Sequence, residues 1–148
     1  MGASPSYIIS TEQARLDVAL VHRYLSRDSY WAFGVPLQVV QRAIRNSLCF
    51  GLYEHDLQIG FARVVTDAAT FGYLADVFIV PGHRGRGLGK QLIAAVMAHT
   101  DLQGLRRFML ATRDAHELYR QFGFGEPKNP QVLMERHDPD VYQQIELR

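Results

Sequence analysis

Apolar residues change their spacing along this chain in a way that separates helices from strands. Near the N-terminus and after residue 86 they recur at three- and four-residue intervals, as in a helix with one buried face. Between residues 48 and 80 they come in short runs rich in phenylalanine, valine and isoleucine, as in strands. The pattern predicts helices over 11–24 (capped by Thr11), from Pro36 past Ile44, 87–99 and 115–122, and strands over 7–10, 48–53, 58–66, 71–80, 107–111 and 132–134.

The order of these elements predicts a mixed α/β fold. Three successive strands with tight connections, one of them a turn at His55–Asp56, indicate an antiparallel meander. The strand that ends near Val80 is followed by a helix and another strand, which indicates a βαβ crossover with parallel pairing. Because 148 residues suit one compact core, we expect a single domain over 1–148.

Composition and charge argue against several classes of protein. Sixteen lysines and arginines against fifteen acidic residues give a net charge of +1, which disfavours a general nucleic-acid binder; the adjacent Arg106 and Arg107 are the argument for an RNA-associated enzyme as a weaker alternative. The single cysteine excludes an internal disulfide, and the six histidines lack paired ligand spacing, so we expect no metal site. No apolar run reaches the roughly 20 residues of a membrane helix. We expect a cytoplasmic protein that binds neither nucleic acid nor membrane.

One glycine-rich segment points to a chemistry. It reads Arg84-Gly85-Arg86-Gly87-Leu88-Gly89-Lys90 and lies between a predicted strand and a predicted helix. Glycines let backbone N–H groups approach an anion, and the positive end of the helix dipole lies at the same place. The glycine spacing differs from that of a dinucleotide-binding loop, and the first glycine and the Ser/Thr of a Walker loop are missing. The segment therefore predicts a phosphate site of another kind.

The pattern that remains is Arg84-x-x-Gly87-x-Gly89 after Val80-Pro81, and it resembles the pyrophosphate loop of the GNAT superfamily of N-acetyltransferases. The segment 118–124, Leu-Tyr-Arg-Gln-Phe-Gly-Phe, is similar to a second signature of that superfamily, a short helix ending in L-Y-x-x-x-G-F. Together the two cover roughly residues 71 to 124. The resemblance implies the GNAT acyl-CoA acyltransferase fold, a mixed and mostly antiparallel sheet with splayed fourth and fifth strands, flanked by helices.

The resemblance also implies an activity and a co-substrate. The enzyme would transfer the acetyl group of acetyl-CoA to a primary amine of a small molecule or peptide, by direct attack in a ternary complex and without a metal. The pantetheine arm would pair with the fourth strand like an added strand. The residues expected to bind acetyl-CoA are Phe78, Ile79, Val80, Arg84, Gly85, Arg86, Gly87, Leu88, Gly89, Lys90 and Thr112, the last in place of an asparagine found in many members.

Two residues are candidates for the proton transfers. Tyr119 occupies the superfamily's general-acid position, from which a phenol donates to the departing thiolate; the alternative is a core aromatic. Asp76 is the acidic residue of the fourth strand and the candidate base, or else a structural carboxylate bound to a neighbouring loop. Diamine acetyltransferases of the superfamily have an acidic pair there, and Ala75 replaces its first member. Relays through water to other groups, namely Glu54, Asp67 or His116, are further alternatives for the base.

The acceptor would be recognised by the loop between the first two helices, as in the superfamily. In this chain the loop contains Tyr30, Trp31 and Phe33, which could receive a cationic or aromatic amine through cation–π or stacking contacts, or could pack over the sheet. Arg63 on the third strand would face the same cleft or pair on the surface. A homodimer is compatible with the sequence. The alternative function is a non-catalytic acyl-CoA-binding sensor or subunit, which the missing acidic residue at Ala75 favours.

Overall fold

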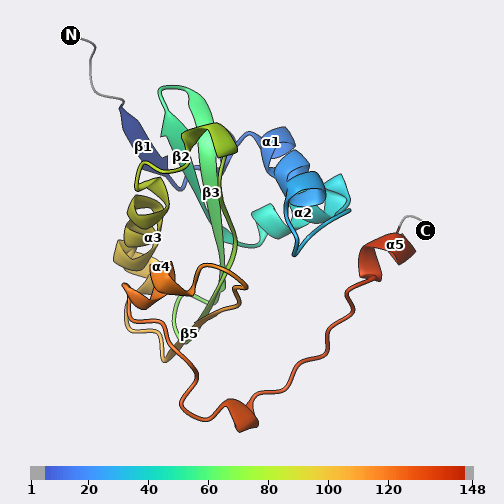
Figure 1. Ribbon diagram of the computed structural model, residues 1–148, viewed down its shortest axis with the longest axis vertical. Coiled ribbons are helices and arrows are strands. Elements are labelled where there is room, and N and C mark those ends of the chain that lie inside the picture. Colours follow the sequence, from blue (N-terminus) through green and yellow to red (C-terminus); the bar gives the residue numbers. More distant parts are fainter. Residues whose placement is uncertain (1–5, 146–148) are drawn as a thin grey trace.

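The computed structural model describes residues 6–145 and shows a sheet with helices on both faces (Figure 1). The strands are β1 (Tyr7–Ser10), β2 (Leu48–Glu54), β3 (Leu57–Thr66), β4 (Phe71–Ile79) and β5 (Arg107–Leu110). The α-helices are α1 (Val18–Arg23), α2 (Leu37–Arg45), α3 (Leu88–Ala98), α4 (His116–Arg120) and α5 (Val141–Ile145). Within residues 6–145, no helix combines the length and the apolar character needed to cross a membrane.

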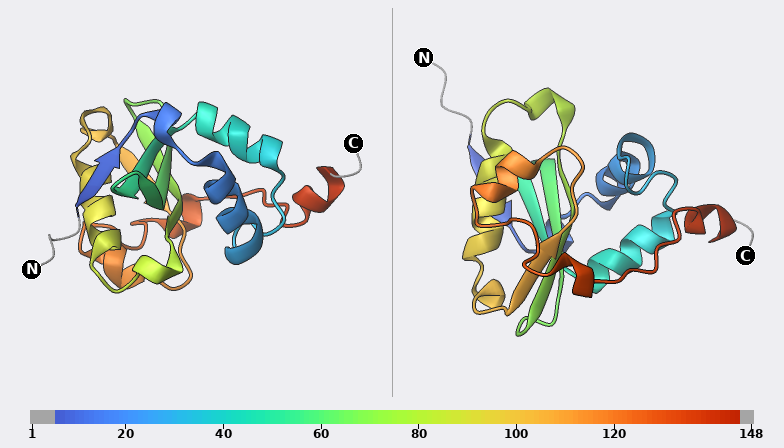
Figure 2. Two further views of the ribbon diagram at one scale, coloured as in Figure 1. Left: turned by 90° about the horizontal axis from the view of Figure 1, so that it is seen from above. Right: turned by 60° about the horizontal axis from the view of Figure 1, so that its bottom comes forward.

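The sheet has the strand order β1-β2-β3-β4-β5, with antiparallel pairing up to β4 and parallel pairing between β4 and β5. The predicted meander, the turn at His55–Asp56 and the βαβ crossover are therefore confirmed. One face packs against α3, whose Leu92, Ile93 and Val96 are fully buried, and the other face packs against α1 and α2 (Figure 2). This mixed, mostly antiparallel sheet with helices on both faces is the arrangement that the resemblance implied.

A β-bulge in β4 separates this strand from β5. Arg63 of β3 lies opposite Ala75 and Phe61 lies opposite Phe78, so the single residue between them on β3 faces two residues on β4. The first of the two, Asp76, has φ 58°, in the left-handed region that aspartate tolerates better than most residues. Pairing of β4 with β5 is confined to Phe71–Leu74, and the remainder of β4 runs free on that side. The predicted splay of the two strands begins at this bulge.

The predicted helix over 11–24 is divided in two, which corrects the sequence-based prediction. Gln13–Arg15 form a 3-10 turn, and α1 begins only at Val18. The helix cap is Asp17 rather than Thr11, because Asp17 Oδ1 accepts the N–H of Leu20 at 3.0 Å. The Asp17 N–H donates to Gln58 Oε1 at 2.7 Å, so β3 fixes the position of this cap. A tertiary contact thus makes the α-helix begin later than the periodicity alone predicts.

The predicted strand over 132–134 is also wrong. Pro130–Val132 form a 3-10 turn, and the N–H groups of Val132 and Leu133 donate locally to the carbonyls of Asn129 and Pro130. The three aliphatic residues have strand-like character, but among the described residues no neighbouring strand pairs with them. A strand needs a partner for its backbone groups, and a pattern in the sequence does not provide one.

Replacing Asp17 with alanine is expected to lower the free energy of unfolding by about 0.5–2 kcal/mol, because the first turn of α1 loses its cap. Urea titration followed by circular dichroism measures the change. Asp17→Asn is the matched control, since asparagine caps equally well without the charge. Equal stability of the alanine and asparagine variants would contradict the capping role.

Candidate active site

A cleft of about 390 Å³ opens where β4 and β5 separate. Its walls come from the middle of β4 (residues 73–77), from the end of β5 and the segment that follows it (110–115), from α4 and from the loop that precedes α2. Eight side chains in these walls are polar or aromatic: Tyr30, Trp31, Tyr73, Asp76, Thr112, Arg113, Asp114 and Tyr119. We refer to this space as the β4–β5 cleft.

The free edge of β4 presents backbone groups on the open side. The Val80 N–H donates to the Ile59 carbonyl of β3 at 2.8 Å, and Phe78 is paired with Phe61, so the backbone groups of Val80 and Phe78 face β3. Backbone groups alternate in direction along a strand, which turns those of Val77 and Ile79 toward the open side. Of the predicted pantetheine-binding set, only Ile79 has this orientation. Sequence reasoning missed Val77, because the bulge determines which backbone groups of β4 face the open side, and no pattern of residues predicts the bulge.

Tyr119 of α4 lies between the core and the β4–β5 cleft. Its side chain is 8% exposed, packs in the main hydrophobic cluster and also lines the cleft. Burial, together with smaller contributions from Tyr30 and Asp114, raises the pKa of Tyr119 to about 12. The phenol is therefore protonated at neutral pH and can act only as a hydrogen-bond donor or proton donor toward an anion. Both sequence-based interpretations, the core aromatic and the acid in the cleft, are compatible with this position.

Asp76 is held by two donors. The Trp31 Nε1–H donates to Asp76 Oδ1 at 2.8 Å, and the Arg63 Nε–H donates to Oδ2 at the same distance. Arg63 in turn donates from Nη1 to Ser47 Oγ at 3.1 Å. Both members of the ion pair are mostly buried, with exposed side-chain fractions of 18% for Arg63 and 12% for Asp76. These contacts fit a structural carboxylate that ties the aromatic loop to the bulge in β4.

The loop before α2 places two of its three aromatic residues in the cleft. The rings of Tyr30 and Trp31 meet edge to face, with centroids 5.0 Å apart. The Arg113 N–H donates to the Tyr30 hydroxyl at 2.9 Å, and its guanidinium carbon lies 3.8 Å from the centroid of the Tyr30 ring. Phe33 is 72% exposed and lies outside the walls of the cleft, as does Arg63. Sequence reasoning missed Asp114, which also lines the cleft.

The glycine-rich loop leaves amide groups without acceptors at the start of α3. Gly85 and Gly87 have φ values of 81° and 72°, which residues with a side chain rarely adopt. The next three N–H groups, those of Leu88, Gly89 and Lys90, have no acceptor in the described part of the chain. Free amides at the N-terminus of an eleven-residue helix suit an anion, and the exposed Lys90 adds a positive charge beside them.

The two arginines of this loop are bound to the body of the protein. Arg84 donates from Nε to the Ile79 carbonyl at 3.1 Å and from Nη2 to the Tyr24 hydroxyl at 2.7 Å. Arg86 donates to the Tyr7 hydroxyl at 3.1 Å and has Glu54 within 3.9 Å. Arg84 thus links the loop to the free edge of β4, since the Ile79 carbonyl is one of the groups on the open side.

Comparison with known proteins identifies the family. The family described as "Acetyltransferase (GNAT) family" matches residues 18–124 of the sequence. The chain belongs to this family. A protein of Gibberella zeae, provisionally named an acetyltransferase, is 37% identical over 135 residues, which cover 76% of this chain and 75% of the relative.

Solved structures agree with this assignment. A protein of Xanthomonas campestris pv. campestris, provisionally assigned to the GNAT family and solved by crystallography, is 56% identical in sequence to this chain. The two structures superpose with a TM-score of 0.91 over 95% of this chain and 99% of the relative. This likeness extends beyond residue 124 into the C-terminal segment. An aminoglycoside N-acetyltransferase solved in complex with CoA shares the fold, with a TM-score of 0.66, 20% identity, and coverage of 93% of this chain and 98% of its own.

The other candidates for a base in this GNAT acetyltransferase lie outside the β4–β5 cleft. Glu54 is 3.1 Å from His83 Nδ1, at the end of the sheet near the glycine-rich loop. Asp67 accepts hydrogen bonds from the Thr70 hydroxyl and from backbone amides of its own turn, which lower its pKa. His116 lies at the start of α4.

Thr112, which the resemblance places among the residues that bind acetyl-CoA, has a local role in the fold. Its hydroxyl oxygen accepts the Ala115 N–H at 3.0 Å and so stabilises the turn that leads to α4.

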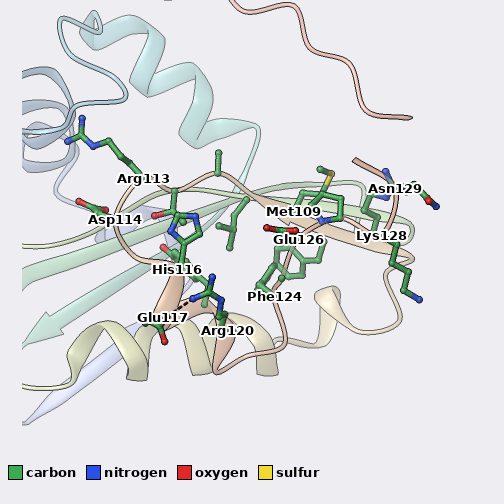
Figure 3. A pocket seen from close by; sticks show the side chains of 18 of the residues that line it. Met109, Arg113, Asp114, His116, Glu117, Arg120, Phe124, Glu126, Lys128 and Asn129 are labelled. Atoms are coloured by element: carbon green, nitrogen blue, oxygen red, sulfur yellow. Dashed lines mark hydrogen bonds and ion pairs between the residues drawn. The ribbon is translucent and has the colours of Figure 1, made fainter. Parts of the chain in front are cut away.

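A larger groove of about 1440 Å³ runs along β5 and α4 (Figure 3). Figure 3 shows Arg113 and Asp114 at one end of this β5 groove and Lys128 and Asn129 at the other. Several residues line both spaces, among them Thr112, Asp114 and Tyr119. The two spaces are therefore neighbours across the segment that follows β5.

Replacing Asp76 with alanine is expected to destabilise the protein by about 1.5–3 kcal/mol, because the Arg63 guanidinium loses its charged acceptor. Asp76→Asn retains an acceptor and tolerates the left-handed backbone, so a smaller loss is expected. Urea titration measures both, and Asp28→Ala, which removes an exposed carboxylate near the same loop, is the control. A stability of Asp76→Ala equal to that of Asp28→Ala would refute the structural role.

Proposed function

We propose that this GNAT acetyltransferase transfers the acetyl group of acetyl-CoA to a primary amine of a small molecule or peptide, by direct attack in a ternary complex. The separation of β4 from β5 carries this proposal. It exposes a backbone edge on one side of the β4–β5 cleft and leaves a protonated phenol, Tyr119, on the other. A thioester and an amine brought together between these two sides would meet a proton donor in a largely buried place.

Acetyl-CoA would be bound along a line from the start of α3 to this cleft. The amides of Leu88, Gly89 and Lys90 and the ammonium group of Lys90 would receive the pyrophosphate. The outward backbone groups of Val77 and Ile79 would bind the amides of the pantetheine arm, as an added strand does at a sheet edge. The Ile79 carbonyl now accepts a hydrogen bond from Arg84, so this arginine would have to exchange that contact for one with the co-substrate.

The transfer then needs one bond made, one bond broken and proton transfers at both nitrogen and sulfur. An acceptor that arrives as an ammonium first loses one proton to water; the amine nitrogen then forms a bond to the acetyl carbonyl carbon, and the bond between that carbon and the CoA sulfur breaks. Tyr119 donates its proton to the sulfur and is reprotonated from solvent, while the nitrogen releases its second proton to water. Because Asp76 is held by Trp31 and Arg63, we assign it to positioning the cleft rather than to removing this proton.

The acceptor would be a cation when it arrives. The exposed ring of Trp31 offers a face for an ammonium group, whereas the Arg113 guanidinium already lies over the ring of Tyr30. Asp114 lies in the same cleft, and among residues 6–145 no lysine or arginine forms an ion pair with it. An ammonium group drawn to this carboxylate would lie close to Tyr119. These features favour amines over hydroxyl acceptors.

Replacing Lys90 with alanine is expected to weaken CoA binding roughly tenfold, because a charge-assisted contact to phosphate is lost. Binding of pantetheine, which lacks the pyrophosphate, should be unchanged. Calorimetric titration of both ligands measures the difference, with the exposed Lys128→Ala variant as a charge-matched control. Equal losses for the two ligands would show that Lys90 does not contact the pyrophosphate.

Release of CoA thiol from acetyl-CoA, measured against a panel of polyamines, arylalkylamines, amino acids, aminoglycosides and short peptides, tests the activity. We expect one class of amine to support turnover and Tyr119→Phe to lower kcat by about 10²–10⁴-fold with unchanged CoA binding. Because the pKa of Tyr119 is raised to about 12, its donor form persists beyond the pKa of an ordinary phenol, and kcat should not fall as the pH passes 10. Tight CoA binding without transfer to any amine would favour the sensor interpretation instead.

A further inference from the structure

The β4–β5 cleft contains one basic side chain, Arg113, in the segment that follows β5. The nearby Arg63 is already bound to Asp76, so its charge is neutralised. Within residues 6–145, no carboxylate forms an ion pair with Arg113, and no hydrogen bond uses the N–H groups of its guanidinium. A guanidinium has five N–H donors, and here all of them are available to an anion that enters the cleft.

Tyr30 holds this guanidinium in a defined place. The guanidinium carbon lies 3.8 Å from the centroid of the Tyr30 ring, and the Arg113 backbone N–H donates to the hydroxyl of the same tyrosine at 2.9 Å. The Tyr30 ring in turn meets Trp31 edge to face, and the Trp31 indole N–H is bound to Asp76. A long side chain that is already ordered loses less entropy when it binds a ligand.

Asp114 gives the cleft a second charge, of opposite sign. Neighbouring opposite charges often pair with each other, but no ion pair joins Arg113 to Asp114. Figure 3 shows the Arg113 side chain pointing away from the centre of the β5 groove. Burial raises the pKa of the Tyr119 phenol and Asp114 contributes to the same shift, which indicates that the carboxylate lies near the proton donor. The cleft therefore has a negative group close to Tyr119 and a positive group on the ring of Tyr30.

Two separate charges of opposite sign suit a ligand that has both charges itself. The ammonium group of an acceptor would be attracted to Asp114, and a carboxylate of the same molecule could bind Arg113, because the planar guanidinium fork matches two carboxylate oxygens. A polyamine would instead bring a second cation toward Arg113 and be repelled. The volume of about 390 Å³ is that of a site for a small molecule.

We propose that Arg113, held on the ring of Tyr30, binds a carboxylate of the acceptor, so that the substrate of this cleft is a small primary amine that carries a carboxylate, as a free amino acid does. This inference rests on the proposed function and specifies the acceptor that the proposed function leaves open. The amine end lies toward Asp114 and Tyr119, and the carboxylate end lies beside Tyr30. Arg113 determines specificity and takes no part in the proton transfers.

Matched acceptors test the proposal in the thiol-release assay. Tyrosine and tyramine, or γ-aminobutyrate and propylamine, differ only in the carboxylate. In at least one such pair we expect kcat/KM to be about 10- to 100-fold higher for the acid, mainly through KM. Arg113→Gln should abolish this preference, and Arg113→Lys should retain part of it, since the charge remains without the fork. Arg45→Gln, at an exposed residue of α2 outside the cleft walls, removes the same charge and should keep the preference.

A binding measurement separates this inference from the proposed activity. Calorimetric titration of the CoA-bound protein with the N-acetylated form of each acceptor needs no acetyl transfer, and the acetylated acid should bind at least about tenfold more tightly than its partner in one pair. A preference without any transfer would support the carboxylate site and contradict the proposed activity. No preference in any pair, or a preference that persists in Arg113→Gln, would overturn the inference even if transfer occurs. Loss of CoA affinity in Arg113→Gln would assign Arg113 to the co-substrate and overturn it as well.

Discussion

The bulge at Asp76 is the constraint on which the rest of the site depends. With one extra residue on β4 opposite Ala62, the strand bends away from β5 after four paired positions. The backbone edge of β4, the cleft beside it and the approach to Tyr119 all follow from that separation. Aspartate tolerates the left-handed backbone required at the bulge, and its carboxylate then binds Trp31 and Arg63 from two other parts of the chain.

The same contacts connect the fold to the proposed acceptor site. Trp31 belongs to a loop without regular structure, and its indole N–H is fixed by the strained residue of β4. Ser29 is buried and accepts the Ala32 N–H through its hydroxyl, which holds the loop from within. The loop therefore brings its aromatic rings to the cleft with defined orientation. Ordering these side chains before an acceptor arrives reduces the entropy that binding must offset.

Local features could be predicted from the sequence, whereas features that depend on contacts between distant parts of the chain could not. The glycine-rich loop, the His55–Asp56 turn and the face of α3 are encoded by neighbouring residues, and each lies where the pattern indicated. The start of α1 was misplaced because its cap at Asp17 is positioned by Gln58, 41 residues away. Val77 was overlooked because the orientation of its backbone groups depends on the bulge.

The error at residues 132–134 has the same physical origin. A run of aliphatic residues indicates how well a segment fits a sheet, but strand formation also needs an edge within reach. Within residues 6–145 no strand pairs with the outer edge of β5, and Val132 and Met134 are exposed. Because the segment after β5 lines both the groove along β5 and the cleft beside Tyr119, a movement of this segment would change the shape of both spaces together.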